Sequence, residues 1–213
     1  MARPASPRRS ANCSPAGFRT SRRSRRPPRP RTERVIVPDD EAGIRAALRE
    51  AGESLRKNEV PVGCVIVHDG LIVGRGHNQV ESLKDATAHA EILAIGAASN
   101  ALGGWRLSDC TLYVTLEPCS MCAGAIVLAR LGRVVYGAAD PKAGACGSVL
   151  DVLGERRLNH RAELTAGVLA GECGELLREF FRRRRRAALR LAEAGGLAGD
   201  EPGADPAGGD SGA

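Results

Sequence analysis

Apolar and polar positions alternate with two different periods along residues 39–191, which indicates interleaved helices and strands. A period of three to four residues predicts helices at residues 39–57, 87–98, 120–129 and 172–191. Short runs rich in β-branched residues predict strands at residues 62–67, 71–76, 111–115, 133–136 and 163–166. This order, with one further helix expected before the last strand, predicts an α/β domain whose central sheet is covered by helices on both faces.

Local signals indicate where some elements begin and turn. Asp39 and Asp40 precede the first helix, and their side chains can cap it. The residues at 68–70, His-Asp-Gly, separate two strands and are typical of a hairpin turn. Pro118 precedes a helix and suits the first helical position.

The two ends of the chain differ in composition from the part between them. Residues 1–38 hold 11 arginines and one acid, whereas residues 192–213 hold seven glycines, five acids and no base. Both segments are too poor in apolar residues to form a core, so we expect disorder there and a folded domain over residues 39–191. Three interpretations of the first segment stay open: a transit peptide, a disordered arm, or an upstream extension without function. The proline run at residues 27–30 disfavours a mitochondrial address.

Length and composition narrow the class of protein. A chain of 213 residues suits one domain, and 43% hydrophobic residues can form its core. No apolar run reaches the roughly 18–20 residues of a membrane span, so we expect no membrane helix. Seven cysteines without a secretion signal favour metal binding or burial over disulfides.

The formal net charge of +6 is unevenly distributed. Residues 39–181 hold 14 Lys or Arg and 19 Asp or Glu, while arginines fill positions 182–186. A basic segment beside an acidic domain can bind a polyanion such as nucleic acid. The alternative is a solvated charged surface with no partner.

Two short motifs together indicate a catalytic metal site. Cys119 and Cys122 lie one helical turn apart, so both sulfurs can reach one ion, and His89 begins another helix. One imidazole and two thiolates give Zn²⁺ three protein ligands, and an open fourth position is typical of catalytic zinc. Glu91 lies roughly 200° around the helix from His89, which suits proton transfer better than metal binding. A Cys-x-x-Cys pair by itself also fits a redox pair or half of a structural zinc site.

Seven segments together resemble the bacterial tRNA-specific adenosine deaminases of the cytidine deaminase superfamily. They are Asn58–Val67, Gly76–Asn78, Thr87–Ile92, Leu112–Cys119, Asp140–Gly144, Leu158–His160 and Phe180–Arg185. The zinc motif marks only the superfamily, and the last three segments favour the tRNA enzymes. The resemblance implies a three-layer α/β/α cytidine-deaminase-like fold around a five-stranded mixed sheet.

The resemblance also implies a reaction, a cofactor and partners. A water activated by zinc would convert the wobble adenosine of a tRNA anticodon, in an arginine tRNA, to inosine, with Glu91 as proton shuttle. One Zn²⁺ per subunit would be held by His89, Cys119 and Cys122. The protein would be a cytoplasmic homodimer that binds the anticodon stem-loop and no membrane. Further expected RNA and base contacts, carried over by motif, are Asn78 at the flipped adenine and Asp140, Lys142, Phe181 and Arg184 along the RNA path.

Two other functions share part of this pattern. A small-molecule deaminase acting on cytosine or guanine would use the same zinc chemistry, but it has no need of the arginine-rich last helix. A non-catalytic RNA-binding protein with a structural zinc is the third alternative. Ala86 stands where the family usually has proline, and Ala139 stands where it often has arginine. Neither residue belongs to the zinc motif, so these differences concern the affinity for RNA rather than the chemistry. Of Phe180 and Phe181, we expect one in the core and one exposed.

Overall fold

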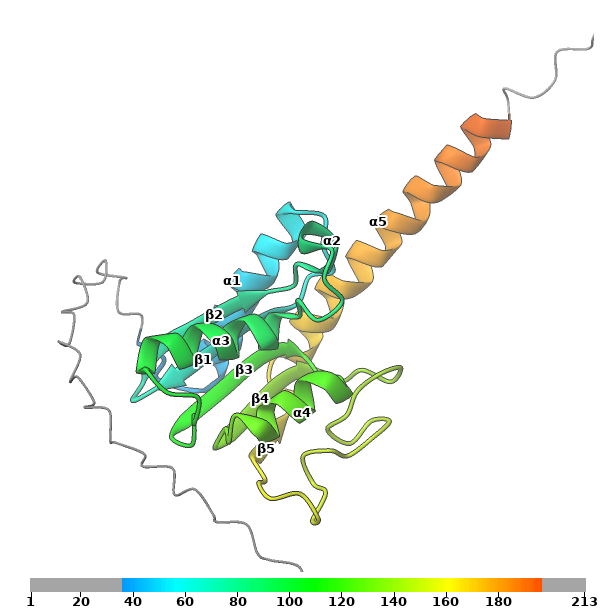
Figure 1. Cartoon of the computed structure of the whole chain (residues 1–213). Coiled ribbons are helices and arrows are strands. Elements are labelled where there is room, and N and C mark those ends of the chain that lie inside the picture. The colour runs from blue at the N-terminus through cyan, green and yellow to red at the C-terminus, as the bar shows by residue number, and fades with distance from the viewer. Residues whose placement is uncertain (1–35, 197–213) are drawn as a thin grey trace, which may run out of the picture. The chain divides into compact units, whose positions relative to one another are not determined.

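The computed structural model of the chain describes residues 36–196. Five helices and five strands follow one another within this range (Figure 1). In chain order they are α1 (Asp40–Arg56), β1 (Gly63–His68), β2 (Leu71–His77), α2 (Val80–Leu83), α3 (Ala90–Leu102), β3 (Cys110–Leu116), α4 (Ser120–Leu128), β4 (Arg133–Ala138), β5 (Glu163–Ala166) and α5 (Ala170–Gly196).

The strands form one five-stranded sheet in the order β2-β1-β3-β4-β5. Strand β1 is antiparallel to both β2 and β3, whereas β3, β4 and β5 are parallel to one another. The expected mixed five-stranded sheet is therefore confirmed.

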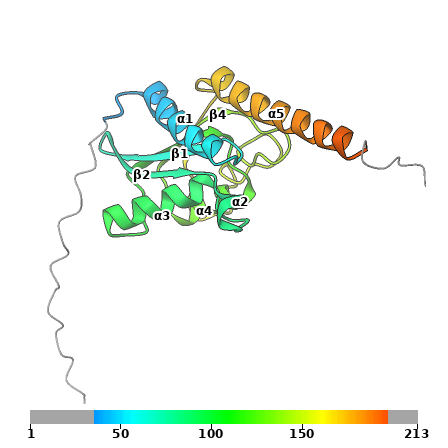
Figure 2. The ribbon, with the colours of Figure 1, turned by 90° about the horizontal axis from the view of Figure 1, so that it is seen from above.

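Helices cover both faces of the sheet, with α1 and α5 on one face and α3 and α4 on the other (Figure 2). Successive side chains on a strand point to opposite faces. On β1, Ile66 packs in the core beneath α3 and α4, while Val65 packs in the core beneath α1. Leu112 and Tyr113 on β3 divide between the two cores in the same way. The predicted three-layer α/β/α arrangement is confirmed.

Most predicted elements form within a few residues of their expected positions. The Asp39 side chain caps α1 by accepting the Ala42 N–H at 2.8 Å, and β5 has the expected bounds. Asp69 and Gly70 connect β1 and β2 with φ angles of 49° and 71°. Positive φ at both central residues is typical of a type I′ turn. The hairpin that the sequence predicted at residues 68–70 is therefore confirmed.

Some local predictions were wrong. No helix forms between β4 and β5, because residues 139–162 cross between these parallel strands through turns and isolated bridges. Pro118 does not occupy the first helical position, since Cys119 has the extended backbone of an N-cap and Ser120 is the first residue of α4. Helix α5 continues to Gly196, and the short helix α2 had no clear signal in the sequence.

The folded region begins before residue 39. Ile36 forms an isolated antiparallel bridge with Leu71, and the Val37 side chain is only 8% exposed in the core beside α1. Disorder was expected over residues 1–38 and 192–213, and this is wrong for residues 36–38 and for residues 192–196, which continue α5. The remaining positions of these two segments, 1–35 and 197–213, also carry the open question of the role of the arginine-rich start. These positions lie outside the described residues, so those expectations stay predictions.

Two properties of the described residues bear on the class of protein. No helix between residues 36 and 196 is long and apolar enough to cross a membrane. The six cysteines in this range are all free, which agrees with the expectation that they bind metal or are buried.

An ion pair joins α1 to the start of β4. The Arg133 guanidinium donates two hydrogen bonds to the Asp40 carboxylate, at 2.7 and 2.8 Å, and the Tyr113 hydroxyl donates a third at 3.2 Å. The hydrogen bonds from Arg133 hold the pKa of Asp40 below its ordinary value despite partial burial. A lowered folded-state pKa stabilises the fold above the unfolded pKa, and this stabilisation is lost as the pH falls through the folded pKa.

We therefore expect Asp40→Asn to destabilise the protein at pH 7 by about 1–2 kcal/mol, because Arg133 loses its charged acceptor. The difference from the wild type should shrink as the pH falls from about 4, the ordinary pKa of the carboxyl group in the unfolded chain, through the lower pKa of the folded state, where the wild-type carboxylate becomes protonated. Urea unfolding at pH 7, 5 and 3 measures both effects. Asp109→Asn, at an exposed aspartate, is the control and should follow the wild type. A D40N curve parallel to the wild type at all pH values would contradict this role.

Candidate active site

The three expected metal ligands meet where the first residues of α3 and α4 lie side by side. His89 is the N-cap residue of α3, Cys119 is the N-cap residue of α4, and Cys122 lies in the first turn of α4. Helix α3 lies directly on β2. The two elements are so close at Gly76 that a Cβ atom there would clash with the Ala90 carbonyl, so only glycine allows this approach. This close approach sets the height of His89 above the sheet.

The distances among these side chains fit a tetrahedral zinc ion. The Nδ1 atom of His89 lies 3.6 Å from the Cys119 sulfur and 3.5 Å from the Cys122 sulfur. All three donor atoms lie within 4.8 Å of one another. Zinc bonds of ordinary length at the tetrahedral angle place nitrogen and sulfur about 3.6 Å apart. The donor set and its spacing therefore suit zinc with three protein ligands and one open position.

The electrostatics of the two thiols also suit a cation. The Cys122 thiol and the His89 ring both stabilise the Cys119 thiolate, which lowers the pKa of Cys119 to about 3. The same hydrogen bond and burial raise the pKa of Cys122. The hydrogen bond to Cys119 raises the pKa of His89. The thiolate favoured at Cys119 is the ionised form in which cysteine binds a divalent cation.

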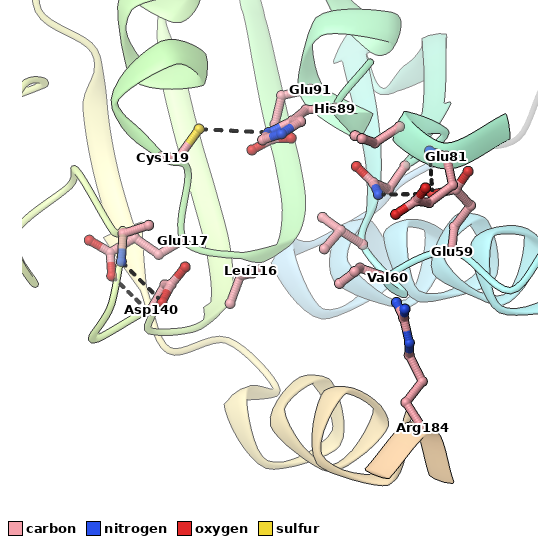
Figure 3. A pocket seen from close by; sticks show the side chains of 14 residues that line it. Glu59, Val60, Glu81, His89, Glu91, Leu116, Glu117, Cys119, Asp140 and Arg184 are labelled. Carbon is pink, nitrogen blue, oxygen red and sulfur yellow. Dashed lines mark hydrogen bonds between the residues drawn. The ribbon is translucent and has the colours of Figure 1, made fainter. Parts of the chain in front are cut away.

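Glu91 lies in the first turn of α3, and its side chain is only 4% exposed. It lines the same pocket as His89 and Cys119 (Figure 3). Burial is the main cause that raises the pKa of its carboxyl group. A carboxyl group with a raised pKa can both accept and release a proton near neutral pH, as general acid–base catalysis requires.

The pocket beside these residues has a volume of about 270 Å³. Asn78 and Asp140 line it from the ends of β2 and β4, and Arg184 extends toward it from α5 (Figure 3). The remaining lining residues are Glu59, Val60, Val62, Val80, Glu81, Leu116, Glu117 and Ala143.

Two expected RNA-contacting residues lie outside the pocket wall. Lys142 is exposed, and its backbone N–H donates to the Asp140 carboxylate at 2.9 Å. Phe181 is 42% exposed on α5, whereas Phe180 is 3% exposed, so the expected division between these two rings is confirmed. Both Lys142 and Phe181 can meet only parts of a substrate that extend beyond the pocket.

Sequence reasoning missed two buried carboxylates in the pocket wall. Glu117 is 2% exposed and accepts backbone N–H groups from Asp140, Cys146 and Ser148 and the Ser148 hydroxyl. Burial raises its pKa, but these hydrogen bonds outweigh burial and hold the pKa below its ordinary value. Glu117 thus fixes the segment after β4 beside Cys119.

Glu59 is the other missed carboxylate, and it is 1% exposed. It follows α1 and accepts hydrogen bonds from residues at and after the end of β2. The sequence did contain a signal for Glu59 and Glu117. Each is an acidic residue directly before an apolar residue or a proline, and each lies in one of the segments that resemble the tRNA deaminases. Such acids are rarely buried without partners.

Comparisons with known proteins agree with this site. A family model described as MafB19-like deaminase matches residues 38–185. A tRNA-specific adenosine deaminase of Bacillus subtilis (strain 168) is 51% identical over 147 residues, which are 69% of this chain and 91% of that protein.

Two solved structures are also similar. One, from studies of A-to-I editing by tRNA:A34 deaminases at the wobble position, is 44% identical with a TM-score of 0.62, over 63% of this chain and 98% of that chain. A guanine deaminase from Nitrosomonas europaea is 26% identical with a TM-score of 0.59, over 70% of this chain and 87% of that chain.

Proposed function

Because the chain belongs to the family of tRNA-specific adenosine deaminases, we propose that it hydrolyses the wobble adenosine of a tRNA anticodon to inosine and ammonia. The observation that carries the proposal is the group of His89, Cys119 and Cys122 at zinc-binding distances beside the buried Glu91. The resemblance to the family implies an arginine tRNA as the substrate, and we include this in the proposal.

The chemistry divides between the cofactor and the chain. A zinc ion held by His89, Cys119 and Cys122 supplies the Lewis acidity that activates a water molecule. Glu91 takes a proton from this water and gives it to N1 of the adenine ring. The oxygen of the water bonds to C6, and the bond from C6 to the amino nitrogen then breaks as Glu91 transfers the second proton of the water to that nitrogen, so that water and adenosine yield inosine and ammonia. The carboxyl group suits both steps because burial raises its pKa.

The size of the pocket supports a single extruded base as the reacting group. A pocket of about 270 Å³ lies near the lower end of the range of small-molecule sites and has room for one base. A base in an anticodon loop is unpaired, so turning it out of the stack costs little compared with a base in a duplex. Asn78 would contact the base, and Asp140 and Arg184 lie where the flanking nucleotides would pass.

A deaminase of free bases is the second candidate, and the similarity to guanine deaminase favours it. The positions of the arginines on α5 favour RNA. Arg184 reaches the pocket wall, and Phe181 is exposed one turn before it, which offers a phosphate contact beside a ring for stacking.

We further propose that the protein is a cytoplasmic homodimer with one zinc ion in each subunit. The homodimer rests on the resemblance to the family, and the exposed apolar side chains of Leu128 on α4, at 73%, and Leu150, at 51%, are candidates for its contact surface.

The decisive experiment incubates the purified full chain with an anticodon stem-loop that carries adenosine at the wobble position. Mass spectrometry of the digested RNA should detect inosine at that position, and free guanine and cytosine should remain unchanged. Turnover of a free base without turnover of the RNA would reverse the order of the two candidates.

The arginines of α5 are expected to contribute unequally to RNA binding. Arg183 donates to the Glu179 carboxylate at 2.6 Å, whereas Arg184 lines the pocket. We expect Arg184→Ala to raise KM for the stem-loop about tenfold and to lower the slope of log KM against log salt by about 0.7, the value for one phosphate contact to a single strand.

Arg183→Ala is the matched control for this change, because it removes the same charge from the neighbouring position. Its effect should be smaller, since Glu179 already neutralises Arg183 in the free protein. Equal effects of the two substitutions, or an unchanged salt slope for R184A, would contradict a phosphate contact at Arg184.

A further inference from the structure

We propose that Glu59 is a positioning residue that fixes the side-chain amide of Asn78 and thereby decides which hydrogen bonds the pocket offers to the base. The inference rests on the proposed function, because it concerns how the same pocket distinguishes adenine. Neither residue binds the metal, so Glu59 would act on recognition of the base rather than on the water.

The contacts of Glu59 connect it to one side of the pocket. Its carboxylate accepts the backbone N–H of Ser82 at 2.7 Å and that of Glu81 at 3.2 Å, and both residues belong to α2. It also accepts a hydrogen bond from the Asn78 Nδ2 atom at 3.4 Å. Since Glu59 is 1% exposed, water does not compete for these bonds. One carboxylate therefore holds both α2 and the Asn78 side chain.

The backbone of Asn78 is held independently of Glu59. Its N–H donates to the Val62 carbonyl at 3.0 Å, and its carbonyl accepts the Ser54 hydroxyl at 3.3 Å. The Asn78 side chain is 7% exposed and lines the pocket. With the backbone fixed, rotation of the terminal amide is the main freedom left to this side chain.

A carboxylate removes that freedom because it only accepts hydrogen bonds. The amide must turn its NH₂ group toward Glu59, since the reversed amide would set two oxygen acceptors against each other. Burial raises the pKa of Glu59, but the N–H groups of Ser82 and Glu81 outweigh burial and hold the pKa below its ordinary value, so the carboxylate is ionised at neutral pH. Asn78 thus keeps its carbonyl oxygen and its second N–H for a ligand.

This pair of groups matches one edge of adenine. An asparagine amide recognises adenine by donating to N7 and accepting from the N6 amino group. Glu91 is assigned to N1 in the proposed reaction, which leaves N7 as the ring acceptor on the other side of C6. A base with an oxygen at C6 would face the Asn78 carbonyl with a second acceptor. Fixing the amide therefore favours adenosine as the substrate.

The test measures how strongly each variant depends on N7. Stem-loops carrying adenosine or 7-deazaadenosine at the wobble position are compared by kcat/KM in the wild type, in Glu59→Gln and in Glu59→Asp. The wild type should lose on the order of tenfold with the 7-deaza base. Glutamine at position 59 can donate a hydrogen bond to Asn78 as well as accept one, and the shorter aspartate moves the carboxylate away from Asn78. The Asn78 amide is then no longer fixed in one orientation, so in both variants the loss with the 7-deaza base should shrink to about threefold or less. The intrinsic effect of the deaza base is common to all variants and cancels.

Glu117→Gln is the matched control, because it makes the same change at an equally buried carboxylate of the pocket that does not contact Asn78. It should keep the full loss with the 7-deaza base, even if its kcat/KM for adenosine falls. Two outcomes would overturn the inference. One is a folded Glu59 variant in which the 7-deaza base lowers kcat/KM as much as it does in the wild type. The other is a wild type in which the 7-deaza base does not lower kcat/KM. Failure of the wild type to deaminate the adenosine stem-loop would instead overturn the proposed function.

Discussion

The Glu91→Gln variant is expected to keep its zinc ion and to lose about 10²–10⁴-fold in kcat on the anticodon stem-loop. Glutamine preserves the volume of a side chain that is 4% exposed, so the packing of α3 on β2 should not change. It cannot carry protons between water, N1 of the base and the leaving amino group. The measurement is single-turnover formation of inosine, which separates the chemical step from RNA binding.

The expected pattern has three parts that can be checked on one preparation. Zinc content by elemental analysis and the affinity for the stem-loop should equal those of the wild type, while inosine formation should fall. A purely structural role for Glu91 would lower zinc content or thermal stability together with activity. An E91Q protein with one zinc per subunit and a wild-type rate would remove Glu91 from the mechanism.

Removal of the metal should have the other large effect. Chelation is expected to reduce deamination to below about 1% of its starting rate, and added Zn²⁺ should restore it, because no group of the chain replaces the Lewis acid. The melting temperature should fall as well, since a ligand bound only to the folded state at about 1,000 times its Kd contributes about 4 kcal/mol.

Cysteine variants separate loss of the metal from loss of a buried side chain. Cys122→Ala should lose stoichiometric zinc and about 10³-fold or more in activity, because two ligands do not hold the ion for catalysis. Cys64→Ala is the matched control, since both cysteines are 0% exposed but Cys64 is not part of the ligand group. Full activity of C122A after exhaustive chelation would contradict a zinc-dependent reaction.

The placement of the chemical groups at the metal was predictable from the sequence. His89, Glu91, Cys119 and Cys122 occupy two short local motifs, and each motif lies at the start of a helix, α3 or α4. The residue types by themselves indicate a zinc ion with an open position and a proton carrier beside it. Only the details of the helix starts differed, since His89 and Cys119 are N-cap residues rather than residues of the first turn.

The residues around the base were predictable only in part. Of the residues expected along the RNA path, Asp140 and Arg184 line the pocket, whereas Lys142 and Phe181 lie outside it, so the RNA contacts of all four stay predictions. Glu59 and Glu117 were missed. Whether a side chain on α5 reaches the pocket depends on how that helix packs on β3 and β4, which local periodicity does not specify. The further helix expected between β4 and β5 was wrong for a related reason. That segment, residues 139–162, is fixed in part by its hydrogen bonds to Glu117, and these are long-range contacts.

The sequence by itself predicted most of the helices and strands and singled out His89, Cys119 and Cys122 as candidate zinc ligands with Glu91 as candidate proton carrier, because these predictions depend on local periodicity and on the chemistry of single side chains. The tertiary structure alone decided that Glu59 faces Asn78 and that Glu117 faces Ser148. The partners in each pair are 19 and 31 residues apart in the chain, and only the folding of the sheet brings them together. The roles of the Glu59 and Glu117 carboxylates depend on those partners, because a carboxylate can hold only the hydrogen-bond donors that the fold places beside it.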